Sequence, residues 1–167
     1  MMKRILMMLL LCGLANASLY ITVNGVINPP DSTVTIKPSD TLWIGIWDDG
    51  QTAPGLLAMG LTMGPGSLDA SKMSVQAGVL AAVSDDAGKA GDLGLQSPFI
   101  AMEIGQIQPG TLISEVLFHC DGPGDVTIAL VDDNGIVVDT QVIHQVPEPF
   151  TLATLALGSL LLRRRIA

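Results

Sequence analysis

The sequence predicts an all-β fold, an antiparallel β-sandwich of seven to nine short strands, because three observations agree. Between Ser18 and Gln145 the apolar residues recur mainly with a period of two, as in strands that bury one face. The runs are short and end at turn-forming residues such as Pro29-Pro30 and Gly122-Pro123-Gly124. These turns are regularly spaced, which is typical of a sandwich.

The strand candidates follow one another along this region. Thr111 to Cys120 is the longest, with Val116, Phe118 and Cys120 on one face. Asp132-Asp133-Asn134-Gly135 lies between two β-rich runs and predicts a hairpin turn. The other candidates are residues 19–24, 33–37, 42–47, 55–66, 99–104 and 126–131.

Two segments do not have a clear strand pattern. In Asp69 to Val83, Asp69 could cap a short helix, whereas the spacing of the valines suits a strand equally well. Ser84 to Ser97 contains three glycines and three aspartates, and we expect it to be a surface loop.

The N-terminus, residues 1–17, has the features of a secretory signal peptide. Lys3 and Arg4 precede ten apolar residues, and Ala15-Asn16-Ala17 fits the small-x-small cleavage pattern. We therefore expect the mature chain to begin at Ser18. The alternative is an uncleaved anchor, although the apolar run is short for a span.

The C-terminus, residues 146–167, predicts a membrane segment that holds the chain outside the cytoplasm. The thirteen apolar residues Phe150 to Leu162 would reach about 20 Å as a helix, against a hydrocarbon core of about 30 Å. Snorkelling of arginine and local thinning of the bilayer can make up the difference. Arg163, Arg164 and Arg165 follow the run and place that end in the cytoplasm.

The order of Pro147-Glu148-Pro149, an apolar helix and an arginine cluster resembles the PEP-CTERM sorting signal of bacteria. The resemblance implies processing by an exosortase, a membrane-embedded transpeptidase, and an association with exopolysaccharide or biofilm matrix. It implies that Pro147, Glu148 and Pro149 are recognised, and that Arg163 to Arg165 are the stop. The alternative is an ordinary tail anchor that begins with prolines. Because proteins with this tail have unrelated bodies, the resemblance concerns delivery only.

The body, residues 18–145, resembles the jelly-roll sandwich of cohesin-like and carbohydrate-binding modules. The resemblance rests on the regular spacing of the short strands and on a late strand that ends in Leu117-Phe118-His119-Cys120, before a Gly-Asp turn and a terminal hairpin. The resemblance implies a protein-interaction or carbohydrate-binding module. An immunoglobulin-like sandwich would have a similar rhythm.

The composition of the body excludes one class of partner. Three lysines against fifteen carboxylates leave residues 18–145 with a net formal charge of −12. Nucleic-acid binding needs a basic face, so we expect none. Cys120 is the one cysteine that remains after signal removal, so the mature chain has no internal disulfide and depends on its core.

Trp43 and Trp47 are candidate carbohydrate-binding residues. In a regular strand both rings point to one face about 13 Å apart, and Gly45 leaves that face flat between them. Flat aromatic strips can stack on sugar rings. The alternative is that one or both rings pack under a loop or against a neighbouring strand.

The remaining candidates are metal and catalytic residues. Loop aspartates from different strands could converge on calcium, with Asp85, Asp86 and Asp92 as the contributors, and no other cofactor is indicated. His119 and Cys120 are adjacent in a strand and point to opposite faces, so they cannot share a metal. Because no hydrolase, metalloprotease or phosphate-binding motif is present, we expect no enzymatic activity.

Together these features predict an exported, non-enzymatic protein of the cell envelope, tethered by its tail and then released to the cell surface or extracellular matrix. Its partners would be the exosortase-type transpeptidase, the membrane and a polysaccharide. The alternatives for the body are a carbohydrate-binding module, a cohesin-type protein-interaction module and a secreted hydrolase.

Overall fold

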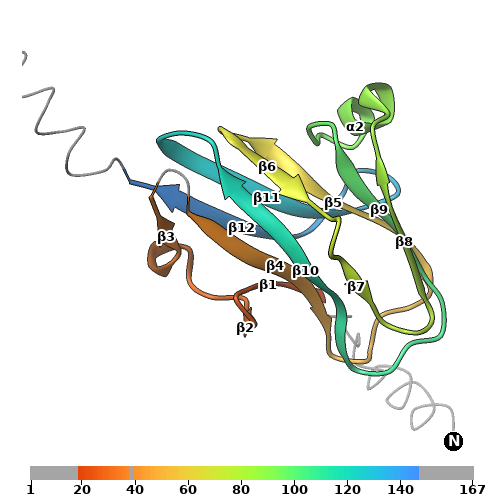
Figure 1. Cartoon of the computed structure of the whole chain (residues 1–167). Coiled ribbons are helices and arrows are strands. Elements are labelled where there is room, and N and C mark those ends of the chain that lie inside the picture. Colours follow the sequence, from red (N-terminus) through yellow and green to blue (C-terminus); the bar gives the residue numbers. More distant parts are fainter. Residues whose placement is uncertain (1–18, 38–39, 147–167) are drawn as a thin grey trace, which may run out of the picture.

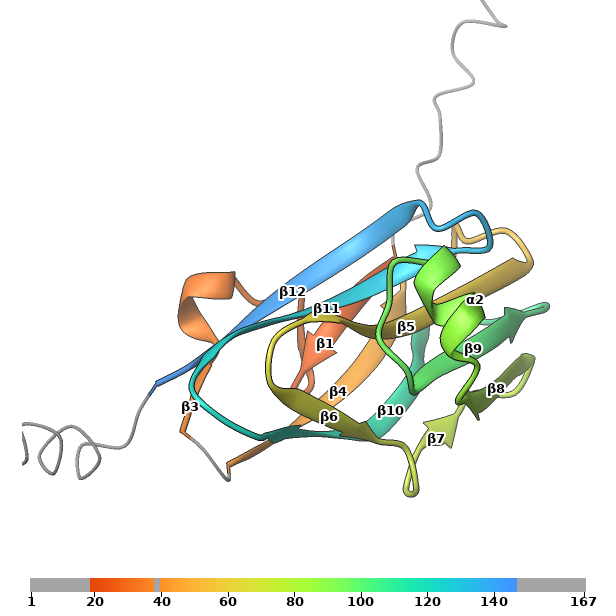
Figure 2. The same cartoon turned by 90° about the horizontal axis from the view of Figure 1, so that it is seen from above.

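Two β-sheets pack face to face and enclose the main core (Figures 1 and 2). The computed structural model describes residues 19–37 and 40–146, which form twelve strands, one α-helix and one 3-10 helix. The predicted signal peptide, sorting motif and membrane segment lie outside these residues. Among the described residues, no helix combines the length and the apolar character that a membrane span requires.

The first sheet, called sheet A, has the strand order β2-β1-β4-β10-β6, with β7 also paired to β10. All its described pairs are antiparallel. The bounds of its strands are β1 Leu19–Val23, β2 Val26–Ile27, β4 Thr41–Asp48, β6 Gly66–Asp69, β7 Ser74–Val75 and β10 Gly110–Cys120.

The second sheet, called sheet B, has the order β3-β12-β11-β5-β9-β8. It is antiparallel except where β3 runs parallel to the end of β12. The bounds are β3 Thr35–Ile36, β5 Gly55–Met63, β8 Val79–Ser84, β9 Phe99–Ile104, β11 Gly124–Asp132 and β12 Val137–Gln145. The 3-10 helix η1, Asp31–Thr33, precedes β3.

The structure confirms the β-sandwich and extends the expected strand count. Twelve strands replace the predicted seven to nine, and three of them, β2, β3 and β7, have only two residues each. Such short strands carry too few residues to show a period of two. The predicted alternation is correct in β4, where Leu42, Ile44 and Ile46 are buried in the core and Trp43 faces outward.

Two segments differ from the sequence prediction. Residues 55–66 are one strand in the prediction, but β5 ends at Met63 and β6 begins at Gly66 in the other sheet. Gly64 makes this crossing with a φ of +99°. Asp69 to Val83 contains β7 and β8 and no helix. The strand alternative is therefore correct there.

The prediction of a surface loop from Ser84 to Ser97 is wrong. The segment forms the helix α2, Ala87–Asp92, whose N-cap Asp86 accepts a hydrogen bond from the Lys89 N–H at 3.0 Å. Figure 2 shows α2 on the outer side of sheet B. Ala90, Leu93 and Leu95 are buried there in a second apolar cluster, with Ala58, Phe99, Ala129 and Val131 of the sheet. The prediction failed because the many glycine and aspartate residues of this segment indicated a loop, although its three buried residues are apolar.

The predicted hairpin at Asp132-Asp133-Asn134-Gly135 joins β11 to β12. Asp132 accepts hydrogen bonds from the N–H groups of Ile136 at 2.8 Å and Asn134 at 2.9 Å. The bond from Ile136 is the main reason why the pKa of Asp132 is lowered. Gly135 takes the positive φ that the turn requires.

Asp139 of β12 joins the two sheets at one edge of the sandwich, because its Oδ2 accepts a hydrogen bond from the Ile21 N–H of β1 at 2.7 Å. Burial raises the pKa of Asp139, against the opposing effect of this bond. A carboxyl group with a raised folded-state pKa destabilises the fold when it is ionised. This penalty is present above the folded-state pKa and is lost as the pH falls below the unfolded value of about 3.9.

We therefore predict that Asp139→Asn, which keeps an acceptor for Ile21, gains stability relative to the wild type as the pH rises. Urea unfolding of both proteins at pH 3, 5 and 7 measures this difference. A difference in unfolding free energy that is constant with pH would contradict the prediction. Asp133→Asn, at an exposed turn position, removes one carboxylate in the same way and serves as the control, and an equal pH trend in both variants would show that the trend does not come from the burial of Asp139.

Candidate functional site

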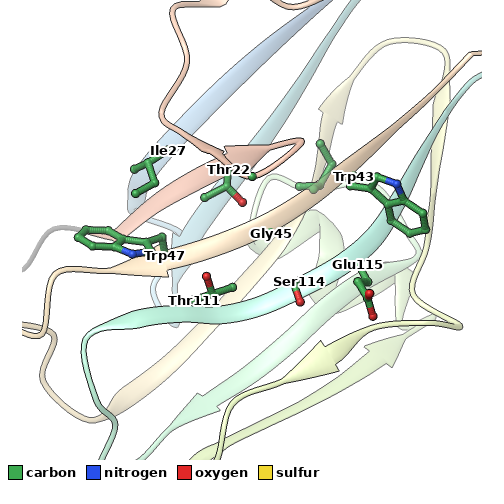
Figure 3. A pocket seen from close by; sticks show the side chains of 10 residues that line it. Thr22, Ile27, Trp43, Gly45, Trp47, Thr111, Ser114 and Glu115 are labelled. Carbon is green, nitrogen blue, oxygen red and sulfur yellow. The ribbon is translucent and has the colours of Figure 1, made fainter.

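An open groove of about 300 Å³ crosses the outer face of sheet A. Trp43 and Trp47 of β4 stand at its two ends, with Gly45 between them (Figure 3). The sequence prediction that both rings share one face is thus confirmed. The remaining lining residues come from β1, β2 and β10 and from the turn between β1 and β2: Thr22, Gly25, Ile27, Thr111, Ser114 and Glu115, with Ile44 of β4.

The floor of the groove is Gly45, and the structure explains why this residue is a glycine. A β-bulge in β10 shifts the register, so that Ser114 and Glu115 lie opposite the single residue Gly45. Glu115 takes a φ of +60° in this bulge. The Ile113 carbonyl oxygen of β10 lies 2.5 Å from the point where a Cβ of residue 45 would be, and Thr22 Oγ1 of β1 lies 2.8 Å from it. A larger residue would therefore fill the groove and clash with the backbone of β10.

Both tryptophans are held by their neighbours. The backbone N–H of Trp43 donates to Asn24 Oδ1 at 2.9 Å, and the backbone carbonyl of Trp43 accepts from the backbone N–H of Asn24 at 2.7 Å. Trp47 pairs in register with Tyr20, and the two rings are 6.0 Å apart between centroids at an angle of 31°. Trp43 is 41% exposed and Trp47 is half-buried. The alternative that a ring packs against a neighbouring strand applies in part, to Trp47.

Sequence reasoning did not find the other lining residues. The dipeptide Asn24-Gly25, with positive φ at both residues, is a hairpin signal that would have revealed β2 and Ile27. The bulge that places Ser114 and Glu115 beside Gly45 has no such local signal. It depends on the pairing of β10 with β4, which are far apart in the sequence.

A second surface lies on the outer face of sheet B. Leu56 of β5, Leu80 and Ala82 of β8, and Ala101 of β9 point outward from three neighbouring strands, and we call this set the apolar face. Leu80 is 71% exposed and Leu56 is 53% exposed. Since β8 is the last strand of sheet B and has no charged residue, nothing in its sequence protects this edge.

The apolar face continues into a hollow of about 240 Å³ beside α2, where Phe99 and Leu93 form part of the wall. Asp132 and Asp133 in the β11–β12 hairpin stand at the margin of the hollow, and Glu103 of β9 lies between Leu56 and Leu80, with which it pairs in register. Lys89 of α2 is the basic residue that lines the hollow. The surface therefore combines exposed aliphatic side chains with mainly acidic charge.

The candidate calcium ligands do not form a cluster. Asp86 caps α2, and Asp85 and Asp92 are exposed at its two ends. In residues 19–37 and 40–146, no group of three or more histidine, cysteine, aspartate or glutamate side chains is arranged to hold a metal ion. Calcium binding by these aspartates stays a prediction from the sequence.

His119 and Cys120 point to opposite faces of β10, as predicted. The His119 side chain is 46% exposed, whereas Cys120 is buried with its Sγ 2.6 Å from Gln145 Oε1. The sorting residues Pro147, Glu148, Pro149 and Arg163 to Arg165, and the cleavage residues Ala15, Ala17 and Ser18, lie outside the described part of the chain.

No family model and no curated protein matches the sequence. Among solved structures, the chain is similar to a non-cellulosomal cohesin from the archaeon Archaeoglobus fulgidus, with 11% identity and a TM-score of 0.43 over 83% of this chain and 98% of the other. A type II cohesin domain from the cellulosome of Acetivibrio cellulolyticus has 12% identity and a TM-score of 0.47 over 76% and 94%. A cohesin–dockerin complex from Clostridium thermocellum contains a chain with 9% identity and a TM-score of 0.32 over 77% and 99%. The structural neighbours of this β-sandwich are thus cohesin domains.

Proposed function

We propose that this chain is an exported, non-enzymatic interaction module that binds a partner protein through the apolar face. The observation that carries the proposal is the exposure of Leu80 on β8 and Leu56 on β5, the two strands that flank β9. Contiguous apolar patches on a folded domain mark interaction sites, because leaving them in water is unfavourable. No hydrolase, metalloprotease or phosphate-binding motif in the sequence indicates catalysis beside these aliphatic side chains.

The charges of the apolar face define the chemistry of the partner. Glu103 lies between Leu56 and Leu80, Asp132 and Asp133 stand beside the hollow, and the body as a whole has a net charge of −12. A complementary surface would present aliphatic side chains together with lysine or arginine. Electrostatic attraction of this kind accelerates association and weakens as salt is added.

Delivery is part of the proposal. The signal peptide starts export, the arginines after residue 162 stop it, and an exosortase-type enzyme processes the chain at its Pro-Glu-Pro motif. The body would then act in the cell envelope or the extracellular matrix, as a structural or adhesive component. Support comes from the order of these elements at the two ends of the chain.

We predict that a photo-reactive amino acid at position 80, in the full chain produced in its native cells, forms a covalent adduct with one defined protein. The same amino acid at Thr140, which is exposed on β12 in the same sheet, is the matched control and should give no adduct. The adducts are identified by mass spectrometry after purification from the envelope fraction. Equal adducts at both positions, or none at position 80, would refute the proposed interface.

The charge of the partner is tested on the identified pair. Leu80→Glu should abolish binding, because it replaces an aliphatic contact by a second carboxylate beside Glu103. Glu103→Gln should leave the apolar contact intact and reduce the dependence of the association rate on salt. Surface plasmon resonance with the full chain at two ionic strengths measures both effects. A rate that is independent of salt in the wild type would contradict the basic charge of the partner.

A further inference from the structure

We propose that the groove between Trp43 and Trp47 binds a neutral polysaccharide. The groove belongs to sheet A and the apolar face to sheet B, so this site does not depend on the proposed protein interface. The chain would then hold a protein on one sheet and a polymer on the other.

The two indole rings provide the apolar part of the site. Their Cα atoms are four residues apart in one strand, which corresponds to about 13 Å, and the glycine between them leaves the path along the strand open. A ligand that contacts both rings must be extended, as a sugar chain is. The apolar C–H faces of sugar rings suit such flat aromatic surfaces.

The strand that carries the rings is held in place before a ligand arrives. Two hydrogen bonds to Asn24 hold the backbone of Trp43, and Tyr20 supports the ring of Trp47. A site that is already ordered loses little conformational entropy on binding, which favours affinity. In this respect the groove differs from an exposed aromatic residue on a loop.

Hydroxyl and carboxylate groups lie between the two rings. Thr22 comes from β1, and Thr111, Ser114 and Glu115 come from β10, on the two sides of Gly45 (Figure 3). These groups can donate and accept hydrogen bonds with sugar hydroxyls. A groove with aromatic ends and a polar middle matches a ligand whose rings have apolar faces and polar edges.

The charges of the groove select a neutral polymer. Glu115 is the charged residue in its lining, and none of the three lysines in the described part of the chain contributes to it. A polymer of uronic acids would bring carboxylates toward Glu115 and toward a body with a net charge of −12, and no cation in the lining would offset the repulsion. Neutral sugars carry no such penalty.

The test measures binding of the full chain to soluble polysaccharides by isothermal titration calorimetry, in a detergent without a sugar headgroup. The neutral probes are a β-glucan, a galactomannan, an arabinoxylan and dextran, and the acidic probes are alginate and polygalacturonate. We expect binding to at least one neutral probe and none to the acidic probes at low salt. Absence of binding to all neutral probes, or equal binding to an acidic one, would overturn the proposal.

Variants then locate the site on the probe that binds. Trp43→Ala should weaken binding about tenfold or more, as truncation of a central aromatic residue does at interfaces, and Trp43→Phe should retain most of it. Thr41→Ala is the matched control, because Thr41 is exposed on the same face of β4 and does not line the groove. Unchanged binding by Trp43→Ala would overturn the assignment to this groove.

Two further measurements show that a loss of polysaccharide binding comes neither from unfolding nor from damage to the protein interface. The urea midpoint of each variant shows whether it is folded. Leu80→Glu should bind the polysaccharide as the wild type does, and Trp43→Ala should retain the crosslink at position 80. The two proposals can therefore fail independently of each other.

Discussion

Replacement of Gly45 by alanine is expected to lower the free energy of unfolding by about 3 kcal/mol, the upper end of the usual cost of over-packing. The new Cβ would lie 2.5 Å from the carbonyl oxygen of Ile113 and 2.8 Å from Thr22 Oγ1. The first atom belongs to the backbone of β10 and cannot rotate away. Because β4 is paired with β1 and β10 on its two sides, relief requires movement of a neighbouring strand.

Urea unfolding of the wild type and Gly45→Ala measures this loss. Gly91→Ala is the matched control, because a Cβ at Gly91 meets no atom within 4 Å and the residue lies in α2. This control should be neutral or should gain up to about 1 kcal/mol, since alanine favours a helix over glycine. A loss in Gly45→Ala of less than about 0.5 kcal/mol, the size of an ordinary surface effect, would show that β10 yields easily at the bulge.

Replacement of Pro147, Glu148 and Pro149 together by alanine should leave export intact and abolish processing of the tail. Proline lacks an N–H and restricts φ, so under the proposal the motif would keep the chain extended before the membrane segment. Alanine has the highest helix propensity, and it would allow the apolar helix to extend toward the body. The peptide that the transpeptidase must reach would then be in a helix.

The intact mass of the protein from the cell envelope measures both events. We expect the loss of residues 1–17 in the wild type and the variant, and a shortened C-terminus in the wild type alone. Val146→Ala, directly before the motif, should mature as the wild type does. Maturation of the triple variant at the wild-type rate would exclude the sorting signal and leave an ordinary tail anchor.

The sequence predicted those parts of the fold in which the alternation of residues within one strand shows which face is buried. The alternation in residues 42–47 correctly separated the apolar residues Ile44 and Ile46, which are in the core, from the face that carries the tryptophans. The same reasoning failed where burial comes from a distant segment. Ala90, Leu93 and Leu95 are buried because α2 lies on sheet B, and no period within residues 84–97 shows that contact.

The two candidate sites differ in the same way. Trp43 and Trp47 were found because a strand places residues four apart on one face, and this depends on one segment. The polar wall of the groove needs the bulge in β10, and the apolar face needs β5, β8 and β9 side by side. Leu80 was not found because its segment fitted a helix and a strand equally. The sequence therefore did not show which of its side chains would be exposed.

The short parallel strand β3 would have a mechanical consequence under the proposal that the tail holds the domain. His144 and Gln145 pair with Thr35 and Ile36, and the Val146 N–H donates to the Ile36 carbonyl at 2.8 Å. On its other side β12 is paired along its length with β11. Tension applied through residue 146 along β12 would act across the antiparallel bonds to β11, which lie perpendicular to the strand, and across the slanted parallel bonds to β3. Such tension shears many bonds at once and does not peel them one by one, so this end of the domain is built to resist pulling.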